Sequence, residues 1–146
     1  MVAIDAEETK NEIRELATIQ RRVIGVLMEK ASTTPDQYPL TLKSLTSGCN
    51  QKSNRDPVTN HSEGTVLSTI DELREMGLVA EVFTDGGRAA RYRHYMRYRF
   101  DFSEAEFAII AELLLRGAQQ PGELRTRAGR WTCPCDLPAL RVFQQH

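Results

Sequence analysis

The segment from residue 78 to residue 96 limits the fold more than any other part of this 146-residue chain. It reads LVAEVF, then TDGGR, then AARYRHYM, so an apolar run and an alternating run are joined by a glycine-containing turn. Asp85, Gly86 and Gly87 are residue types that a tight hairpin turn requires. A two-stranded hairpin is not stable alone in water. We therefore expect this hairpin to pack its apolar face on helices.

Three amphipathic segments before the hairpin are expected to be those helices. The first is TIQRRVIGVLMEKA (residues 18–31), whose apolar residues have the spacing of one helical face. The second covers residues 41–51, and the third follows a capping Ser62 and ends before Gly77. Helix, helix, helix and hairpin is the order of a winged helix-turn-helix. We therefore predict that fold for this part of the chain, with the hairpin as its wing.

The same order begins again after the hairpin. The segment FDFSEAEFAIIAELLLRG (residues 100–117) starts with the capping box Ser103–Glu106, and shorter helical patterns follow at residues 119–129 and 136–145, without a second hairpin. The predicted fold class is mostly α with a small β-hairpin wing (α+β), a tandem winged helix-turn-helix with an incomplete second unit. The predicted domains are a charged N-terminal extension (1–17), winged-helix domain 1 (18–100) and a second winged-helix-like unit (101–146).

The composition limits the class of protein. The chain is 40% hydrophobic and 27% charged, as globular proteins are. No apolar run is long enough to span a bilayer, and the acidic start MVAIDAEETKNEIREL is unlike a secretory signal. We therefore expect a cytoplasmic protein without a membrane partner. The net charge of −1 gives no global attraction to nucleic acid, so a DNA-binding site would have to be local.

Enzymatic motifs are absent from the sequence. It contains no G-x-S-x-G, no H-E-x-x-H and no phosphate-binding glycine loop. Cys49 stands near Asp56 and His61, but it occupies the apolar register of the second helix, so we interpret it as a core thiol. Cys133 and Cys135 form a C-P-C sequence, which is shorter than the usual zinc spacing. We predict no catalytic residues, no metal site, no cofactor and no enzymatic activity.

DNA binding is the usual association of this fold, and the basic wing is the best candidate for the contact. Residues 86–99 contain five arginines and no acid. Arg88 at the hairpin tip, with Arg91 and Arg93 on one strand, can reach phosphates or a narrow minor groove. The third helix is acidic overall, which opposes phosphate contacts, but its hydroxyl groups can touch base edges. The hydroxyl residues expected on its exposed face are Thr65, Ser68 and Thr69.

The polar stretch CNQKSNRDPVTN (residues 49–60) separates the second and third helices. It is longer than the turn of a common helix-turn-helix, and two interpretations remain open. In the first, it is a hydrogen-bonded turn that orients the third helix. In the second, Lys52, Asn54 and Arg55 also contact a ligand or a phosphate beside the wing.

Two functional hypotheses follow from these features. The main one is a winged-helix module that binds double-stranded DNA through its basic wing. The alternative is a protein-interaction or dimerisation scaffold that does not bind DNA, with a second copy or another protein as its partner. The acidic third helix suits the alternative, and a fold alone does not decide between the two.

Three segments resemble the signature segments of the YceH-like family of bacterial proteins. They are TTPDQYPLT (33–41), CNQKSNRDPV (49–58) and LLLRGAQQPGELRTR (113–127). The resemblance covers roughly residues 18–130 and implies tandem winged-helix domains in a small cytoplasmic protein. It implies no established activity and no catalytic residues. After Arg130 the sequence RWTCPCDLPALRVFQQH departs from the acidic third helix and second wing that the family pattern leads us to expect.

Overall fold

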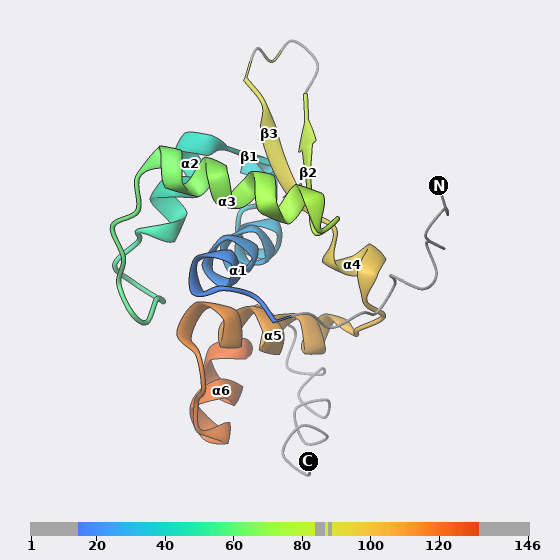
Figure 1. Cartoon of the computed structure of the whole chain (residues 1–146). Coiled ribbons are helices and arrows are strands. Elements are labelled where there is room, and N and C mark those ends of the chain that lie inside the picture. Colours follow the sequence, from blue (N-terminus) through green and yellow to red (C-terminus); the bar gives the residue numbers. More distant parts are fainter. Residues whose placement is uncertain (1–14, 84–86, 88, 132–146) are drawn as a thin grey trace.

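The computed structural model describes residues 15–83, 87 and 89–131 (Figure 1). The N-terminal extension, the hairpin tip and the segment after residue 131 lie outside the described residues, and with them the helix predicted at 136–145. The elements in chain order are α1 (Thr18–Thr33), the 3-10 helix η1 (Pro35–Gln37), β1 (Leu40–Thr41), α2 (Leu42–Cys49), α3 (Glu63–Glu75), β2 (Val79–Val82), β3 (Arg91–His94), α4 (Met96–Arg99), α5 (Glu104–Arg116) and α6 (Pro121–Ala128).

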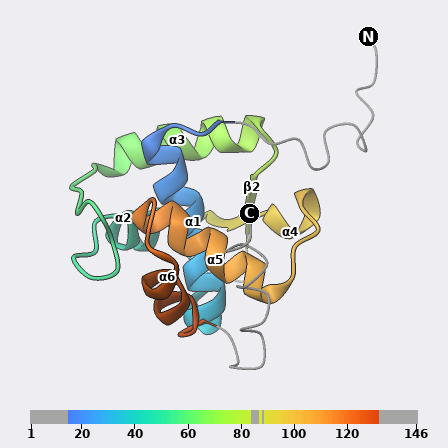
Figure 2. The ribbon, with the colours of Figure 1, turned by 90° about the horizontal axis from the view of Figure 1, so that it is seen from below.

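Helix α1 is the centre of the fold. Its residues 22–29 are all buried, so the helix is covered on every side along two turns. Figure 1 shows α3 on one side of α1 and α5 on the other, and in the view from below α5 lies across α1 with α6 beside it (Figure 2). One continuous core joins apolar side chains of α1, α2, α3, the sheet and α5. Helix α5 is therefore packed directly on α1, the first of the helices that precede the hairpin.

Gly25 allows α1 and α5 to approach closely. A Cβ atom at this position would lie 2.9 Å from Cδ2 of Leu115 and 3.1 Å from Cβ of Leu114. Those distances are shorter than an ordinary contact between carbon atoms. A larger residue at position 25 must therefore push the two helices apart or move the leucines.

We expect Gly25→Val to lower the free energy of unfolding by about 1–3 kcal/mol, the usual cost of overpacking a core. The matched control is Gly122→Val in α6, where a Cβ would meet no atom within 4 Å. Urea unfolding of both variants measures the difference. Equal losses at the two positions would show that the close approach of α1 and α5 does not limit the size of residue 25.

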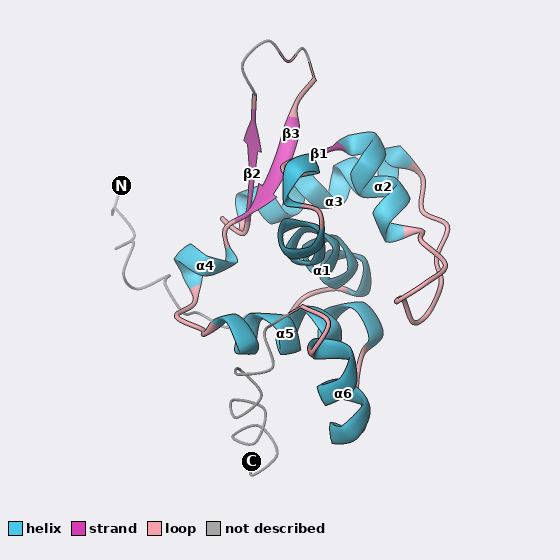
Figure 3. Cartoon of the chain, turned by 180° about the vertical axis from the view of Figure 1, so that it is seen from behind, coloured by secondary structure: helices cyan, strands magenta, loops and turns pink. Residues whose placement is uncertain are grey.

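The three strands form one antiparallel sheet in the order β1-β3-β2. Strands β2 and β3 are the predicted hairpin, and β1 pairs with the other edge of β3 through Leu40–Tyr92 and Thr41–Arg91. Strand β1 was not expected, because two residues carry no periodic signal. Figure 3 shows the sheet at one edge of the helical body. Strand β1 anchors the hairpin to the segment between α1 and α2.

The predicted caps determine where several helices begin. The hydroxyl of Ser62 accepts a hydrogen bond from the backbone N–H of Thr65 at 3.2 Å, which caps α3. The capping box of Ser103 and Glu106 begins α5, with bonds of 3.2 and 2.9 Å. Gly77 has a φ of 74°, the left-handed conformation that ends α3 and turns the chain into the sheet.

The predicted α+β class with a small hairpin is confirmed, as is the order of three helices before it. The second strand ends earlier than predicted, because Met96 begins the short helix α4 instead of continuing the strand. The division at residue 100 into two units stays a prediction. None of the helices in the described part of the chain combines the length and apolar composition of a membrane span.

Candidate functional site

The outer face of the sheet carries the two predicted wing arginines that the structure describes. Arg91 and Arg93 are two residues apart on β3, so their side chains lie on the same face. Arg91 donates from Nη1 to the carbonyl oxygen of Pro39 at 3.0 Å. Arg93 is exposed, with its guanidinium carbon 5.7 Å from the ring centroid of Tyr95. The third predicted wing residue, Arg88, lies outside the described residues.

The carboxylate of the sheet lies on the opposite face. Glu81 is the acidic residue in the three strands, and it is paired with Tyr92, whose side chain is buried. Its Oε2 atom lies 2.8 Å from Nη1 of Arg74 on α3. Glu81 therefore neutralises a cation of α3, and the outer face presents two arginines without an acid from the described strands.

The sequence predicted that the three hydroxyl residues of α3 lie on one exposed face, but the structure places them on different faces. Thr65 and Ser68 are exposed. Thr69 is only 2% exposed, and its hydroxyl donates to the backbone oxygen of Thr65 at 2.9 Å. The prediction that Thr69 faces a ligand is wrong in this respect, because position 69 falls beside the apolar stripe of Val66 and Ile70.

The solvent face of α3 is acidic, as predicted. Its exposed carboxylates are those of Glu63, Asp71, Glu72 and Glu75. Arg74 is already engaged by Asp71 at 3.7 Å and by Glu81 at 2.8 Å. This face repels phosphate groups, so α3 is poorly suited to enter a groove of DNA.

The interhelix loop consists of residues 50–62, between α2 and α3. Its predicted ligand residues do not lie beside the hairpin. The loop lies at the beginning of α3, whereas the hairpin follows the end of that helix (Figure 1). Lys52 is exposed, and Oδ1 of Asn54 accepts a bond from Nη2 of Arg116 at 2.9 Å. Arg55 is only 5% exposed. The second interpretation of the loop, a ligand contact beside the wing, is therefore not supported for Arg55, which points inward.

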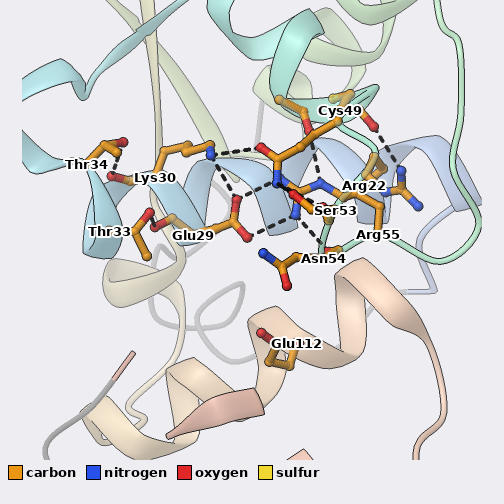
Figure 4. Close-up of polar contacts among 12 residues, drawn as sticks. Arg22, Glu29, Lys30, Thr33, Thr34, Cys49, Ser53, Asn54, Arg55 and Glu112 are labelled. Carbon is orange, nitrogen blue, oxygen red and sulfur yellow. Dashed lines mark hydrogen bonds and ion pairs between the residues drawn. The ribbon is translucent and has the colours of Figure 1, made fainter. Parts of the chain in front are cut away.

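Arg55 forms a buried, bidentate ion pair with Glu29 of α1. Its Nη2 and Nη1 atoms lie 2.6 and 2.9 Å from the two carboxylate oxygens, as Figure 4 shows. Burial by itself would raise the pKa of Glu29, but the hydrogen bonds and charge of Arg55, together with Lys30 and Arg130, lower it to about 2. Arg55 also donates from Nε to the backbone oxygen of Gly48 at 2.9 Å. The side chain therefore fixes the loop to α1 and to the end of α2.

A second arginine extends this buried network to the end of the described chain. Nη2 of Arg130 lies 3.0 Å from Oε2 of Glu29 and 2.6 Å from Oε1 of Glu112 in α5. The indole N–H of Trp131 donates to the same Glu112 oxygen at 2.7 Å. Glu112 is fully buried. The network therefore connects α1, the interhelix loop, α5 and the residues after α6.

Two further side chains hold the interhelix loop in place. Arg22 donates to the backbone oxygens of Cys49 at 2.9 Å and Pro57 at 2.6 Å. Asn50 donates to the backbone oxygen of His61 at 2.8 Å and accepts from its N–H at 2.7 Å. These contacts support the interpretation of the loop as a hydrogen-bonded turn that orients α3. A ligand contact at Lys52 stays a prediction.

Sequence reasoning missed Arg22, Glu29, Glu112 and Arg130. A signal existed for two of them, since Arg22 and Glu29 are seven residues apart on α1 and share the face of the buried Val26. A charged residue in an apolar register is a sign of a buried partner. The partners themselves lie far along the chain, with Arg130 101 residues from Glu29.

Cys49 has the properties of a core thiol. It is fully buried, and burial raises its pKa to about 12, although the charges of Arg22 and Arg55 act in the opposite direction. A thiol with so high a pKa is a poor nucleophile at neutral pH. Within the described residues, no group of three or more His, Cys, Asp and Glu side chains is close enough to hold a metal ion. Cys133 and Cys135 lie outside those residues, and the prediction of no enzymatic activity stays untested.

Comparison with known proteins places this architecture in a family. The family described as "Protein of unknown function, DUF480" matches residues 16–144. A UPF0502 protein of Geobacter sulfurreducens is 54% identical over 125 residues, which cover 86% of this chain and 57% of that protein. UPF0502 proteins of Shewanella pealeana and Psychromonas ingrahamii are 52% and 53% identical, over 80% of this chain and 56% of each relative.

The chain spans about half the length of these curated relatives. The resemblance noted from the three signature segments is confirmed by a match that includes all of them. The chain therefore belongs to the DUF480 family of bacterial proteins, also called UPF0502 and YceH-like.

Proposed function

We propose that residues 18–95 form a winged helix-turn-helix that binds double-stranded DNA through the outer face of its hairpin. The element order α1, β1, α2, α3, β2, β3 and the sheet order β1-β3-β2 support the winged-helix assignment. The observation that carries the DNA proposal is the outer face of the sheet, where Arg91 and Arg93 stand without a carboxylate from the described strands. Arginines arranged in this way make favourable contacts with a phosphate backbone.

The shape of the hairpin suits this mode of contact. Strands β2 and β3 leave the helical body and project past α3 (Figure 1). A projecting ribbon can approach a groove while the acidic face of α3 stays away from the duplex. The proposed contact is thus led by the wing and does not require α3 to enter the major groove.

Substitution of the two arginines tests the proposal. We expect the double variant Arg91→Ala, Arg93→Ala to bind a mixed-sequence duplex at low salt at least about tenfold more weakly than the unmodified chain does. Each of the two substitutions removes a charge-assisted contact with a phosphate. Arg74→Ala is the matched control, since it removes an exposed arginine from the acidic face of α3. Fluorescence anisotropy of a labelled duplex measures both. Equal weakening by the control, or no binding by the unmodified chain, would contradict wing-led binding.

A second candidate function is a protein-interaction scaffold. The observation that favours it is the acidic solvent face of α3, next to the exposed Leu67. Such a face suits a basic protein surface better than a nucleic acid. If the chain instead forms a homodimer, light scattering at micromolar concentration gives twice the mass of the monomer. A strict monomer would contradict the dimer form of this hypothesis.

A further inference from the structure

A cleft on the side of the molecule away from the hairpin has a strongly basic lining. It opens where the first turns of α1 meet the interhelix loop and the C-terminal end of α5, and its volume is about 600 Å³. Its charged residues are Arg21, Arg22, Arg116 and Asp56. Three cations against one carboxylate leave the cleft positive. The volume is in the range of pockets that hold small molecules.

Among the described residues, Arg22 is a buried cation that no carboxylate approaches within ion-pair distance. The side chain is 5% exposed, and its hydrogen bonds go to two backbone oxygens and the hydroxyl of Thr59. Its Nε atom is buried and has no hydrogen-bond partner among the described residues. Burial, followed by the nearby charge of Arg55, lowers the pKa of Arg22, while the charge of Asp56 acts in the opposite direction. A buried charge that lacks a counterion is costly, and an anion in the cleft would relieve this cost.

The other two arginines reach the cleft from different elements. Arg21, on the first turn of α1, donates to the backbone oxygen of Leu16 at 3.4 Å and to the hydroxyl of Thr18 at 3.2 Å, and no carboxylate of the described residues lies within 4 Å of it. The Nε atom of Arg116, at the end of α5, lies 3.5 Å from Oε2 of the buried Glu112. Arg116 is therefore partly neutralised, and Arg21 and Arg22 supply most of the uncompensated charge.

The beginning of α1 adds further donors at the same place. Its N-cap is Ala17, which has no side-chain acceptor for the N–H groups of the first turn, and Thr18 lines the cleft. The N-terminal end of a 16-residue helix carries a partial positive charge that favours anions. The hydroxyl of Thr59 is a further polar group at the wall. Leu113 and Leu114 provide an apolar wall beside these donors.

We propose that this cleft binds a small molecule through a phosphate group. The phosphate lies between Arg21, Arg22 and the first turn of α1, and the body of the ligand packs on Leu113 and Leu114. Two guanidinium groups and a helix N-terminus match a dianion better than a single negative charge. Pro57 and Thr59, which line the cleft, belong to the loop that leads into α3, so a bound ligand contacts the segment that orients this helix.

Inorganic phosphate is the probe that tests the site. Amide chemical shifts of the ¹⁵N-labelled chain are followed while phosphate replaces chloride at constant ionic strength and pH. We expect a saturable change confined to residues that line the cleft, such as Thr18, Thr59 and Gly117. Arg21→Ala, an exposed position, is expected to weaken phosphate binding about tenfold, as the loss of one charge-assisted contact does. Lys43→Ala, which removes an exposed cation of α2, is expected to leave it unchanged.

Several results would overturn the proposal. Linear, unsaturable changes would show general screening of charge, and equal weakening by Arg21→Ala and Lys43→Ala would show that the cleft is not the site. Tighter saturation by malonate than by phosphate would assign the cleft to carboxylate ligands instead. Each outcome is independent of DNA binding, because neither Arg21 nor Lys43 belongs to the proposed wing contact.

Discussion

Removal of the charge of Glu29 is expected to lower the free energy of unfolding by about 3–5 kcal/mol, which is the usual cost of breaking a buried ion pair. In Glu29→Gln, the guanidinium of Arg55 stays buried but loses the carboxylate that now lies 2.6 and 2.9 Å from it. Arg130 loses one of its two carboxylate partners at the same time. The interhelix loop then loses one of its attachments to α1, while the hydrogen bond from Arg22 to the backbone oxygen of Pro57 remains.

The matched control for this variant is Glu104→Gln. Glu104 forms a bidentate pair with Arg97 of the same kind, but the side chains are 64% and 51% exposed. Exposed pairs contribute about 1 kcal/mol or less, because water solvates the ions when the pair breaks. Urea unfolding of both variants at neutral pH compares the two pairs directly. If Glu29→Gln costs no more than Glu104→Gln, burial of the network does not stabilise the fold.

Acidification is expected to destabilise the protein by about 3 kcal/mol as the pH falls from 6.5 to 4, through protonation of His94. Burial, followed by the charges of Arg97 and Arg93, lowers the pKa of His94 from 6.5 to about 4. The unfolded chain therefore binds a proton in this range while the folded chain does not, so stability falls by about 1.4 kcal/mol per pH unit. The Nδ1 atom of His94 accepts a bond from the N–H of Met96 at 3.2 Å, which also requires the neutral ring.

Urea unfolding at a series of pH values tests this prediction. His94→Gln should be less stable at neutral pH but should lose much less stability between pH 6.5 and 4, whereas His61→Gln should keep the steep loss. A second loss is expected below pH 4.5, because the folded-state pKa of Glu29 is lower than its unfolded value and its stabilisation disappears as the carboxylate is protonated. An unchanged pH profile in His94→Gln would contradict the assignment to His94.

Short-range signals in the sequence correctly predicted where helices begin and end, because caps and stops depend on residues that are close together in the chain. Ser62, Gly77 and the Ser103–Glu106 box are short-range features, and each acts in the structure as predicted. The interpretation of residues 89–96 as an alternating strand is correct for Arg91–His94, where Tyr92 and His94 are buried and Arg93 is exposed. These features depend on residues within a few positions of one another, which a single sequence displays.

Contacts between distant residues were not predictable in this way. Charged residues are usually exposed, so a ligand contact of Arg55 was one of the two interpretations of the loop, and only the fold brings this residue to Glu29. The basic cleft combines residues from α1, the interhelix loop and α5, and no motif joins them. Strand β1 depends on its pairing with β3 and has no pattern of its own. Periodicity describes the faces of elements but does not say which faces meet.

The salt dependence of DNA binding tests the central claim most directly. The observed affinity for a duplex is measured over a series of salt concentrations for the unmodified chain and for the double variant Arg91→Ala, Arg93→Ala. Each phosphate contact contributes a slope of about −0.9 in a plot of log affinity against log salt. We predict that the double variant binds more weakly and that its slope is shallower by about 2. Identical slopes, or no binding by the unmodified chain at the lowest salt, would contradict a wing-led DNA-binding module.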